Sequence, residues 1–301
     1  MNTELTLSLN QLFTSQFIDQ VFSGVDVSIK SKADYLYRIH RFQDFILTSG
    51  VFDRNTLLEF KRSISLDSSV TIATKNKYLI VAKIYCQQLY RMGVLKVDIS
   101  TGVKLFRVSS SYKVNGFTDS EVSAIIYKMG TIEDIRLKTI LALKMFSGLR
   151  DIEITRLRVE HLNLQDSIIH VHSKGLNDAI DELPIVPQVK EILSGYLEVT
   201  GKKSGFLFTS DSRRNKGEGL TVKTVWLMVR GFLDELGISR SCHSFRGYFA
   251  TELVKKMSNL FDVAIYTRHK SISTLQNYVN QINKERTLPK YYSAFDGVLV
   301  A

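Results

Sequence analysis

Apolar residues recur at helical spacing through the first hundred residues of the chain. One stripe along the segment "ADYLYRIHRFQDFIL" consists of Leu36, Ile39, Phe42, Phe45 and Ile46. A longer pattern predicts a helix from about Ser69 to Met92, followed by Gly93. Thr56 and Glu59 have the spacing of a capping box for a further helix between these two. The pattern predicts an all-helical N-terminal segment.

A polar stretch, "RVSSSYKVNGFTDSE", interrupts this pattern. It contains three consecutive serines and an Asn-Gly pair at Asn115, both typical of a linker. Thr118 and Glu121 then form a second capping-box signature ahead of an apolar helical stripe. We therefore predict two domains, residues 1–112 and 113–301, a division that suits a chain of 301 residues.

The second segment mixes helical and strand patterns. Residues 132–147 read as a buried helix that stops at Gly148. The stretches "DSIIHVHSKG" and "AIDELPIV" predict a β-hairpin with Lys174 near its turn, and "GFLFTS" predicts a short extended piece. The stretch "TVKTVWLMVRGFLDEL" predicts a helix, and helices resume from Ser244. The expected fold is mainly α with a small β-sheet.

Charge narrows the range of partners. The chain has 40 Lys and Arg against 30 Asp and Glu, a net charge of +10. This surplus favours a polyanion, most often nucleic acid, although an acidic membrane surface has the same sign. The first 113 residues carry 15 basic and 9 acidic side chains. Four of the basic residues, Lys75, Lys77, Lys83 and Arg91, fall on the predicted 69–92 helix.

The two cysteines, Cys86 and Cys242, are far apart and match no metal-binding spacing. Such free thiols suit a reducing compartment. The first thirty residues show no secretory signal, and no apolar run has the length of a membrane span. These features predict a cytoplasmic protein without a membrane partner.

Several polar residues have spacings that suit phosphate chemistry. His243 and Arg246 share a helix face at positions i and i+3, and Ser244 could cap that helix. Glu153 lies three residues after Arg150 and could hold its guanidinium. Taken singly, each pair is better explained as an ordinary solvated side-chain pair. His170 and His172 lie two residues apart on one strand face, a spacing that could suggest a metal site. Because no carboxylate or thiol cluster accompanies them, we treat them as ordinary strand residues.

The order of these residues is more informative than any single one. Arg150 in "SGLRDIEI", Lys174 in "HSKG", His243 and Arg246 in "HSFR", His269 in "RHKS" and Tyr278 in "LQNYV" follow one another along a basic, two-segment chain. This order resembles the tyrosine recombinase family, the phage integrases and Xer-type recombinases. "FAT" at Phe249 also matches, and the resemblance covers residues 113–301. The helical segment resembles the family's DNA-clamping core-binding domain in size and character only.

The resemblance implies a catalytic role for all six residues. Tyr278 would attack phosphorus as the nucleophile, giving a 3′-phosphotyrosyl link to DNA. Arg150 and Arg246 would stabilise the charge on the non-bridging oxygens, and His243 and His269 would add hydrogen bonds and help to move the phenol proton. Lys174 would protonate the departing 5′ oxygen. No metal and no other cofactor is expected.

The sequence departs from the family pattern in several places. Arg268 stands where the family usually has glycine, and Phe245 and Gly247 replace the usual leucine and histidine. Asp178 and Asp181 lie in the hairpin where basic residues are common.

The resemblance implies site-specific recombination of double-stranded DNA by a homotetramer, for integration and excision of a mobile element or for resolution of replicon dimers. Two alternatives remain at this level: a type IB topoisomerase-like enzyme that nicks and reseals, and a catalytically decayed DNA-binding protein or helix-turn-helix regulator. The tail "YYSAFDGVLV", beyond Pro289, is apolar and needs a surface that covers it. It could pack on its own catalytic domain, whereas the resemblance favours docking on a neighbouring protomer in the tetramer.

Overall fold

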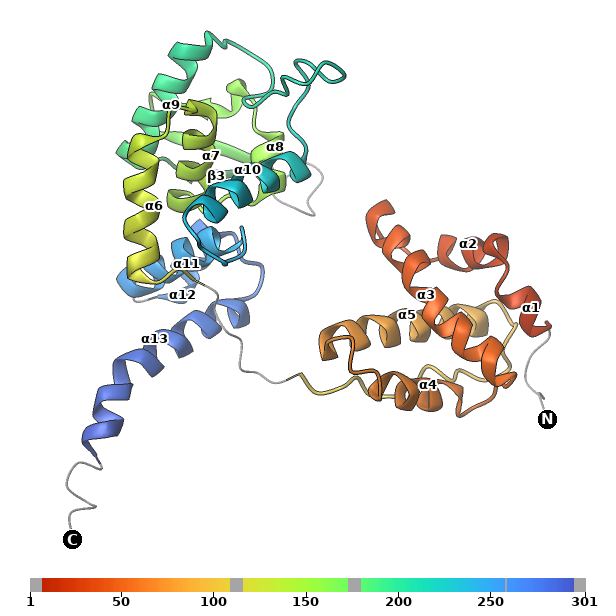
Figure 1. Cartoon of the computed structure of the whole chain (residues 1–301). Helices are drawn as coiled ribbons and strands as arrows, with labels where there is room; N and C mark the ends of the chain where they lie inside the picture. Colours follow the sequence, from red (N-terminus) through yellow and green to blue (C-terminus); the bar gives the residue numbers. More distant parts are fainter. Residues whose placement is uncertain (1–6, 109–115, 173–179, 258, 295–301) are drawn as a thin grey trace. The chain divides into compact units, whose positions relative to one another are not determined.

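The computed structural model divides the chain into two compact units, Met1–Ser111 and Tyr112–Ala301. It describes residues 7–108, 116–172, 180–257 and 259–294. Figure 1 shows a helical first unit, and a second unit in which helices surround a small sheet. The expected fold class, mainly α with a small β-sheet, is confirmed.

The first unit consists of helices packed on one aromatic core. Its elements are α1 (Leu9–Leu12), α2 (Ser15–Ser23), α3 (Ile29–Ser49), α4 (Thr56–Ser65) and α5 (Ile72–Arg91). Ile39, Phe42 and Ile46 from the predicted stripe of α3 are fully buried. Phe42 packs edge-on against Phe60 of α4, with ring centroids 5.0 Å apart. The helical spacing of apolar residues therefore did predict which face of α3 is buried.

Two details of this unit differ from the prediction. The predicted capping box at Thr56 and Glu59 is wrong, because Thr56 is the first helical residue and its hydroxyl accepts from the backbone of Asp53 at 2.7 Å. Helix α5 begins at Ile72 rather than near Ser69, since the Thr71 side chain caps it by accepting from the Thr74 amide. A local Asx or hydroxyl contact thus moves a helix start by a few residues.

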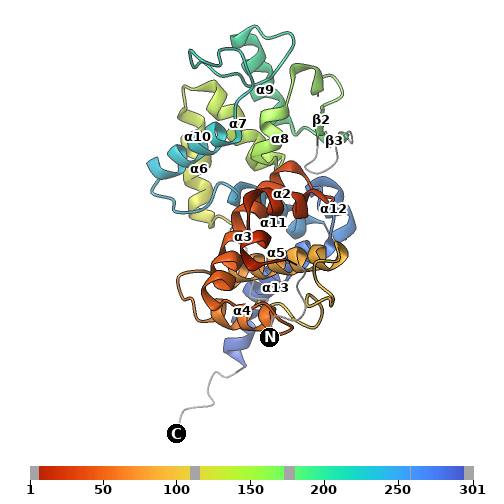
Figure 2. The same cartoon turned by 90° about the vertical axis from the view of Figure 1, so that its right-hand side faces the viewer.

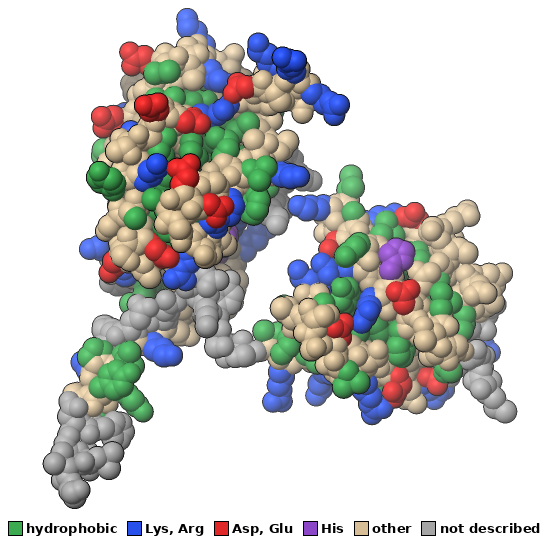
Figure 3. Space-filling model, viewed as in Figure 1, with side chains coloured by type: hydrophobic (Ala, Val, Ile, Leu, Met, Phe, Trp, Pro, Cys, Tyr) green, Lys and Arg blue, Asp and Glu red, His purple; other side chains and the backbone are tan. Residues whose placement is uncertain are grey.

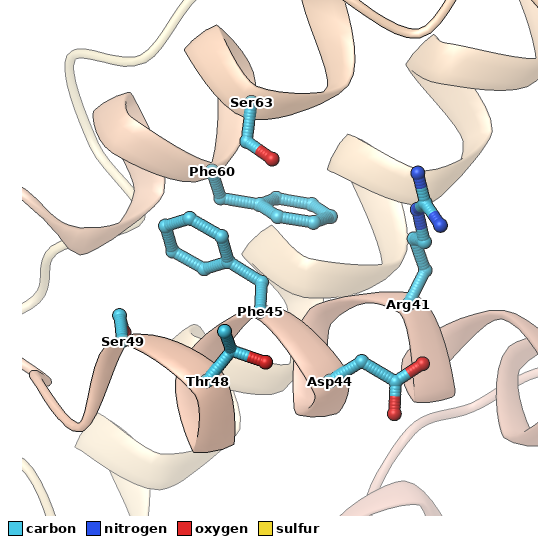
Figure 4. A pocket seen from close by; sticks show the side chains of 7 residues that line it. All are labelled: Arg41, Asp44, Phe45, Thr48, Ser49, Phe60 and Ser63. Carbon is cyan, nitrogen blue, oxygen red and sulfur yellow. The ribbon is translucent and has the colours of Figure 1, made fainter.

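A hollow of about 310 Å³ opens between α3 and α4. Figure 4 shows the rings of Phe45 and Phe60 in it, tilted against each other, with Arg41, Asp44, Thr48, Ser49 and Ser63 around them. Arg41 is engaged elsewhere, by Asp67 at 2.8 Å. This hollow contains none of the residues that the sequence marks for chemistry, all of which belong to the second unit.

The second unit contains the three-stranded antiparallel sheet. Its strands are β1 (Leu162–Asn163), β2 (Ile168–His172) and β3 (Ile180–Pro184), in the order β1-β2-β3. Its helices are α6 (Asp119–Thr131), α7 (Ile135–Phe146), α8 (Asp151–Arg156), η1 (Val159–His161), α9 (Pro187–Thr200), α10 (Val222–Glu235), α11 (Ser244–Lys256), α12 (Leu260–Thr267) and α13 (Ile272–Ser293). The predicted hairpin is present as β2 and β3. The predicted extended piece "GFLFTS" contributes only isolated bridges, at Phe206 and Thr209.

Buried and less buried side chains alternate along the strands, as expected for a sheet with helices on one face. Ile169, Val171 and Leu183 are buried against the helices, whereas His170 and His172 lie on the opposite face of β2. The Thr118–Glu121 capping box at the start of α6 is confirmed, with reciprocal bonds between the two residues. Helices α11, α12 and α13 pack on one another as a group, and Figures 1 and 2 both show α13 extending away from the rest of the unit.

Candidate active site

The sharp turn after α7 places Arg150. Gly148 has φ of +60°, and a Cβ there would lie 2.3 Å from the ring of Phe249, so only glycine fits this turn. Below the turn, the buried ammonium of Lys144 pairs with Asp151. The turn that carries Arg150 is thus fixed by Gly148, by the adjacent Phe249 ring and by the Lys144–Asp151 ion pair, whose two residues flank Arg150 in the sequence.

Glu153 orients Arg150 as its spacing indicates. The Glu153 carboxylate accepts from the Arg150 backbone amide at 2.8 Å and from its Nη1 at 2.7 Å. Glu153 is fully buried, whereas the Arg150 side chain remains 26% exposed. Burial acts to raise the pKa of Glu153, but Arg268, the Arg150 amide, Arg150 and Arg246 outweigh it and lower the pKa below its usual value. The carboxylate therefore stays charged and holds Arg150 with an open side facing solvent.

Arg246 is fixed from two sides. It lies in the first turn of α11, is 2% exposed, and donates from Nη1 to the Gly148 carbonyl at 2.7 Å and from Nη2 to the Thr267 carbonyl. Its Nε has no hydrogen-bond partner among the described residues, which leaves a buried donor available. Burial and the cations Arg150 and Arg268 lower the pKa of Arg246 to about 9, so the guanidinium remains charged at neutral pH.

His243 precedes Arg246 at the start of the same helix. It is itself the N-cap residue of α11 and makes no side-chain cap bond, so the predicted capping role of Ser244 is wrong. The surface of His243 is accessible to solvent, but neighbouring atoms partly desolvate its ring. This desolvation, followed by the nearby cations Arg246, Lys144 and Arg150, lowers the pKa of His243. A neutral imidazole beside two arginines is therefore the ground state.

His269 follows α12 and has a defined hydrogen bond. Its Nδ1 lies 2.7 Å from the Thr267 hydroxyl. That hydroxyl donates to the Val263 carbonyl at 2.8 Å, so it accepts from the imidazole, and Nδ1 carries the proton of the neutral ring. Burial, followed by Arg246 and Arg150, lowers the pKa of His269 to about 4. Nε2 of the neutral ring is then a proton acceptor.

Tyr278 lies on α13, next to this group. It is 6% exposed and packs with Ala250, Val263 and Leu275 in a small cluster shared by α11, α12 and α13. Its phenol is close enough to Arg246 to raise the pKa of the guanidinium. The structure thus brings Arg150, Arg246, His243, His269 and Tyr278 to one region of the second unit, although they are spread over 129 positions from 150 to 278.

Lys174, the sixth predicted residue, and Asp178 lie outside the described residues. The strands that flank them are described, and the ring of His172 at the end of β2 lies tilted against that of His161, with ring centroids 4.9 Å apart. His170 faces Glu182 on the neighbouring strand at 3.5 Å. Within the described residues, no group of three or more His, Cys, Asp or Glu side chains is arranged to hold a metal ion.

Two residues that support the candidate site, Thr267 and Lys144, were missed by sequence reasoning. Thr267 supports both Arg246 and His269, and Lys144 supports the Arg150 turn. Neither residue carries a pattern that distinguishes it from an ordinary helix residue. Arg268, which did stand out as a replacement for glycine, pairs with Glu153 at 2.9 Å.

Comparison with known proteins identifies the class. Residues 116–285, more than half of the chain, match the model of the phage integrase family. The chain therefore belongs to the phage integrase family of tyrosine recombinases.

Its relatives include Xer proteins from archaea and bacteria. The chain is 29% identical to tyrosine recombinase XerA of Pyrococcus horikoshii over 168 residues, 56% of this chain and 57% of that protein. It is 29% identical to tyrosine recombinase XerD of Listeria innocua over 258 residues, 80% of this chain and 84% of the relative. The matches to the Pyrococcus proteins therefore span little more than half the length of those relatives.

Solved structures extend the similarity of fold to both units. The XerH site-specific recombinase in a post-cleavage complex with a palindromic difH substrate aligns with a TM-score of 0.73 and 18% identity, over 95% of this chain and 90% of that one. The Tn1549 transposon integrase bound to circular intermediate DNA aligns with a TM-score of 0.71 and 14% identity, over 91% of this chain and 95% of that one. None of the helices in the described residues is both long and apolar enough to span a membrane.

Proposed function

We propose that this protein is a site-specific DNA recombinase that cuts and rejoins double-stranded DNA through a 3′-phosphotyrosyl intermediate. The observation that carries the proposal is how three cationic or basic side chains are held beside Tyr278. The buried Glu153 carboxylate holds Arg150, the Gly148 and Thr267 carbonyls hold Arg246, and the Thr267 hydroxyl holds His269. Arg246 Nε has no hydrogen-bond partner among the described residues, and the Arg150 guanidinium is partly exposed. Two such groups suit a phosphodiester, whose non-bridging oxygens gain negative charge in the transition state.

Each residue has one role in the proposed cleavage step. The Tyr278 oxygen attacks phosphorus, the bond from phosphorus to the 5′ oxygen breaks, and Lys174 gives a proton to that oxygen. The phenol proton passes to Nε2 of His269, which carries no proton in the neutral ring. His243 donates to a non-bridging oxygen beside Arg246.

Rejoining reverses the step with a 5′ hydroxyl from another strand. Because the phosphodiester energy is retained in the tyrosyl ester, rejoining requires no ATP. The arginines supply the positive charge that metal ions provide in many nucleases. Neither step of the proposal therefore involves a metal or another cofactor.

In this proposal the helical unit is the core-binding domain, the unit from residue 113 is the catalytic domain, and the two close on DNA in the cytoplasm. Recombination of two sites requires a homotetramer. Exposed side chains near the end of α13 support such an assembly: Leu288 is 41% exposed, and Tyr291 and Tyr292 are each 62% exposed. Figure 3 shows hydrophobic side chains gathered on the surface towards the end of α13. The biological outcome is integration and excision of a mobile element or resolution of replicon dimers.

The first experiment tests covalent chemistry. Duplexes that the protein binds are selected from a random library, and a nicked suicide version of the selected site is incubated with protein and resolved on a denaturing gel. We expect a protein–DNA adduct with wild type, with and without EDTA, and none with Tyr278→Phe. An adduct that persists in Tyr278→Phe removes Tyr278 from its role, and activity that EDTA abolishes and magnesium restores contradicts the metal-free mechanism.

A second experiment separates recombination from the chemistry of a type IB topoisomerase, which cuts and reseals one duplex. Two differently labelled duplexes that carry the selected site are mixed with protein. Exchanged products support the recombinase, in agreement with the recombinase names of the relatives above. Relaxation of supercoils without exchange favours the topoisomerase. Binding without any adduct indicates a decayed DNA-binding protein.

A further inference from the structure

Arg268 has an unusual backbone conformation. With φ of 54° and ψ of 45° at the end of α12, it is one of two described non-glycine residues with positive φ. A left-handed conformation costs an L-residue with a Cβ on the order of 1 kcal/mol relative to glycine. Glycine, which the family resemblance implies at this position, adopts the left-handed conformation without that cost. An arginine at this position must contribute through its side chain.

The Arg268 side chain is almost completely enclosed. Only 4% of it is exposed, so it does not reach a bound DNA strand directly. Its Nη2 donates to Glu153 Oε2 at 2.9 Å, and its Nη1 donates to the Tyr266 carbonyl at 3.2 Å. Its Nε has no hydrogen-bond partner among the described residues. The Arg268–Glu153 ion pair joins residues 115 positions apart, and so ties the end of α12 to the start of α8.

Glu153 therefore serves two arginines. Its Oε1 accepts from Arg150 Nη1, and its Oε2 accepts from both the Arg150 amide and Arg268 Nη2. Arg150, Arg246 and Arg268 face this single carboxylate, so the group carries an excess of two positive charges. If position 268 were glycine, the excess would be one, and among the described side chains only Arg150 would still donate a hydrogen bond to Glu153.

We propose that Arg268 is a positioning residue for strand cleavage: it neutralises Glu153, which orients Arg150, and so leaves the charge of Arg150 for the scissile phosphate. The inference rests on the proposed function. It predicts that Arg268 acts on the rate of cleavage of bound DNA and only weakly on DNA affinity, because the enclosed guanidinium makes no contact with the exterior.

Three substitutions separate this role from a purely structural one. Arg268→Gly removes the ion pair and relieves the left-handed strain, Arg268→Ala removes the ion pair and keeps the strain, and Arg268→Lys keeps the charge. Each variant is compared with wild type in cleavage of the selected suicide duplex at saturating protein, in Kd for the same duplex and in thermal unfolding.

We expect Arg268→Gly and Arg268→Ala to cleave about 10-fold or more slowly than wild type, with Kd changed by less than about threefold and with Arg268→Gly the more stable of the two. Arg268→Lys should recover part of the rate. If the cleavage rates of the variants instead rank with their thermal stabilities, and Arg268→Gly cleaves as fast as wild type, the proposal is overturned.

Two further arms test the charge argument. A duplex with a neutral methylphosphonate at the scissile position lacks the negative charge that Arg150 meets, so the rate ratio of wild type to Arg268→Gly should shrink towards one. In a Glu153→Gln background there is no carboxylate to neutralise, so Arg268→Gly should have little additional effect. Ratios that are unchanged in both arms contradict the proposal. If wild type itself forms no adduct, the proposed function fails, whereas an adduct with identical rates in Arg268→Gly refutes only the role of Arg268.

Discussion

The hydroxyl of Thr267 lies 2.7 Å from Nδ1 of His269, and this contact determines which ring nitrogen carries the proton. Because the same hydroxyl donates to the Val263 carbonyl, it can only accept from the ring. The free Nε2 is thus the acceptor that the proposed proton transfer requires.

Thr267→Val should therefore slow cleavage. Without the hydroxyl, the Nδ1 proton loses its acceptor and the ring populates the other tautomer, whose Nε2 cannot accept the phenol proton. We expect a fall of about 10-fold in the cleavage rate of prebound suicide duplex, measured at several pH values. Thr267→Ser retains the hydroxyl and is the matched control. Equal rates for the valine and serine variants would show that the tautomer is not fixed by Thr267.

Acid should weaken the fold through His269. Its pKa is about 4 in the folded protein and about 6.5 for an ordinary histidine. Between these values the unfolded chain binds a proton that the folded protein does not, so the free energy of unfolding falls as pH drops from about 6.5 towards 4 and is unaffected above that window. The lowered pKa of His243 contributes with the same sign.

The measurement is urea unfolding at intervals between pH 7 and pH 4.5. His269→Gln removes one titrating group, so the variant should lose less stability than wild type over this range. A pH dependence identical to that of wild type would mean that His269 is not held neutral in the folded protein.

How much of the fold and of the candidate site the sequence predicts depends on how far apart in the sequence the interacting residues lie. The buried face of α3 and the α6 capping box follow from spacing alone, because both arise within one helix. The pairing of Glu153 with Arg150 was also predictable, since three residues separate them.

By contrast, the contacts of Arg246 with Gly148 and of Arg268 with Glu153 join residues about a hundred positions apart, and no local pattern encodes them. The left-handed backbone of Arg268 was visible only as a missing glycine. The order of the candidate residues predicts a candidate site, whereas the packing of α11 and α12 against the Gly148 turn determines what supports each of them.

Helix α5 shows why charge alone overestimates the DNA-binding surface. The ammonium of Lys75 donates to the Ser65 carbonyl at 2.8 Å, and that of Lys83 donates to the Val103 carbonyl at 2.6 Å. Lys77 and Arg91 are exposed. The structure therefore divides the four basic residues of this helix into two whose ammonium groups bind backbone carbonyls and two that are exposed.

We expect Lys77→Ala and Arg91→Ala each to reduce the slope of log affinity against log salt by about 0.9 where the side chain contacts a phosphate. Lys75→Ala and Lys83→Ala should instead lower the free energy of unfolding by about 1–2 kcal/mol with a smaller change in slope. The measurements are DNA binding at several salt concentrations and urea unfolding. Reversed behaviour of the two pairs would contradict this assignment.

Gly148→Ala tests the turn that carries Arg150. The new Cβ would lie 2.3 Å from the Phe249 ring, and the positive φ adds strain, so we expect a loss of about 2–4 kcal/mol in the free energy of unfolding. Phe249→Ala creates space for the methyl group, and the double variant should lose less than the sum of the two single losses. Strict additivity would show that the ring is not what excludes a side chain at position 148.

The last prediction concerns assembly through the end of α13. Helix α13 continues through Pro289 to Ser293, so the predicted tail begins as helix, and its Tyr291 and Tyr292 present apolar rings to solvent. If these two tyrosine side chains dock on a neighbouring protomer in a closed tetramer, their replacement should affect the pairing of two DNA sites rather than folding or binding to one site. We expect Tyr291→Ser/Tyr292→Ser to bind a single site with nearly unchanged Kd and to melt close to the wild-type temperature. The same variant should lose the paired-site complex in a gel-shift assay and the exchanged products of the recombination assay.

Lys290→Ala, on the same turn, is the matched control and should retain both. Wild-type exchange by the double tyrosine variant would rule out docking through these rings, and a large drop in melting temperature would indicate that they pack on their own unit instead.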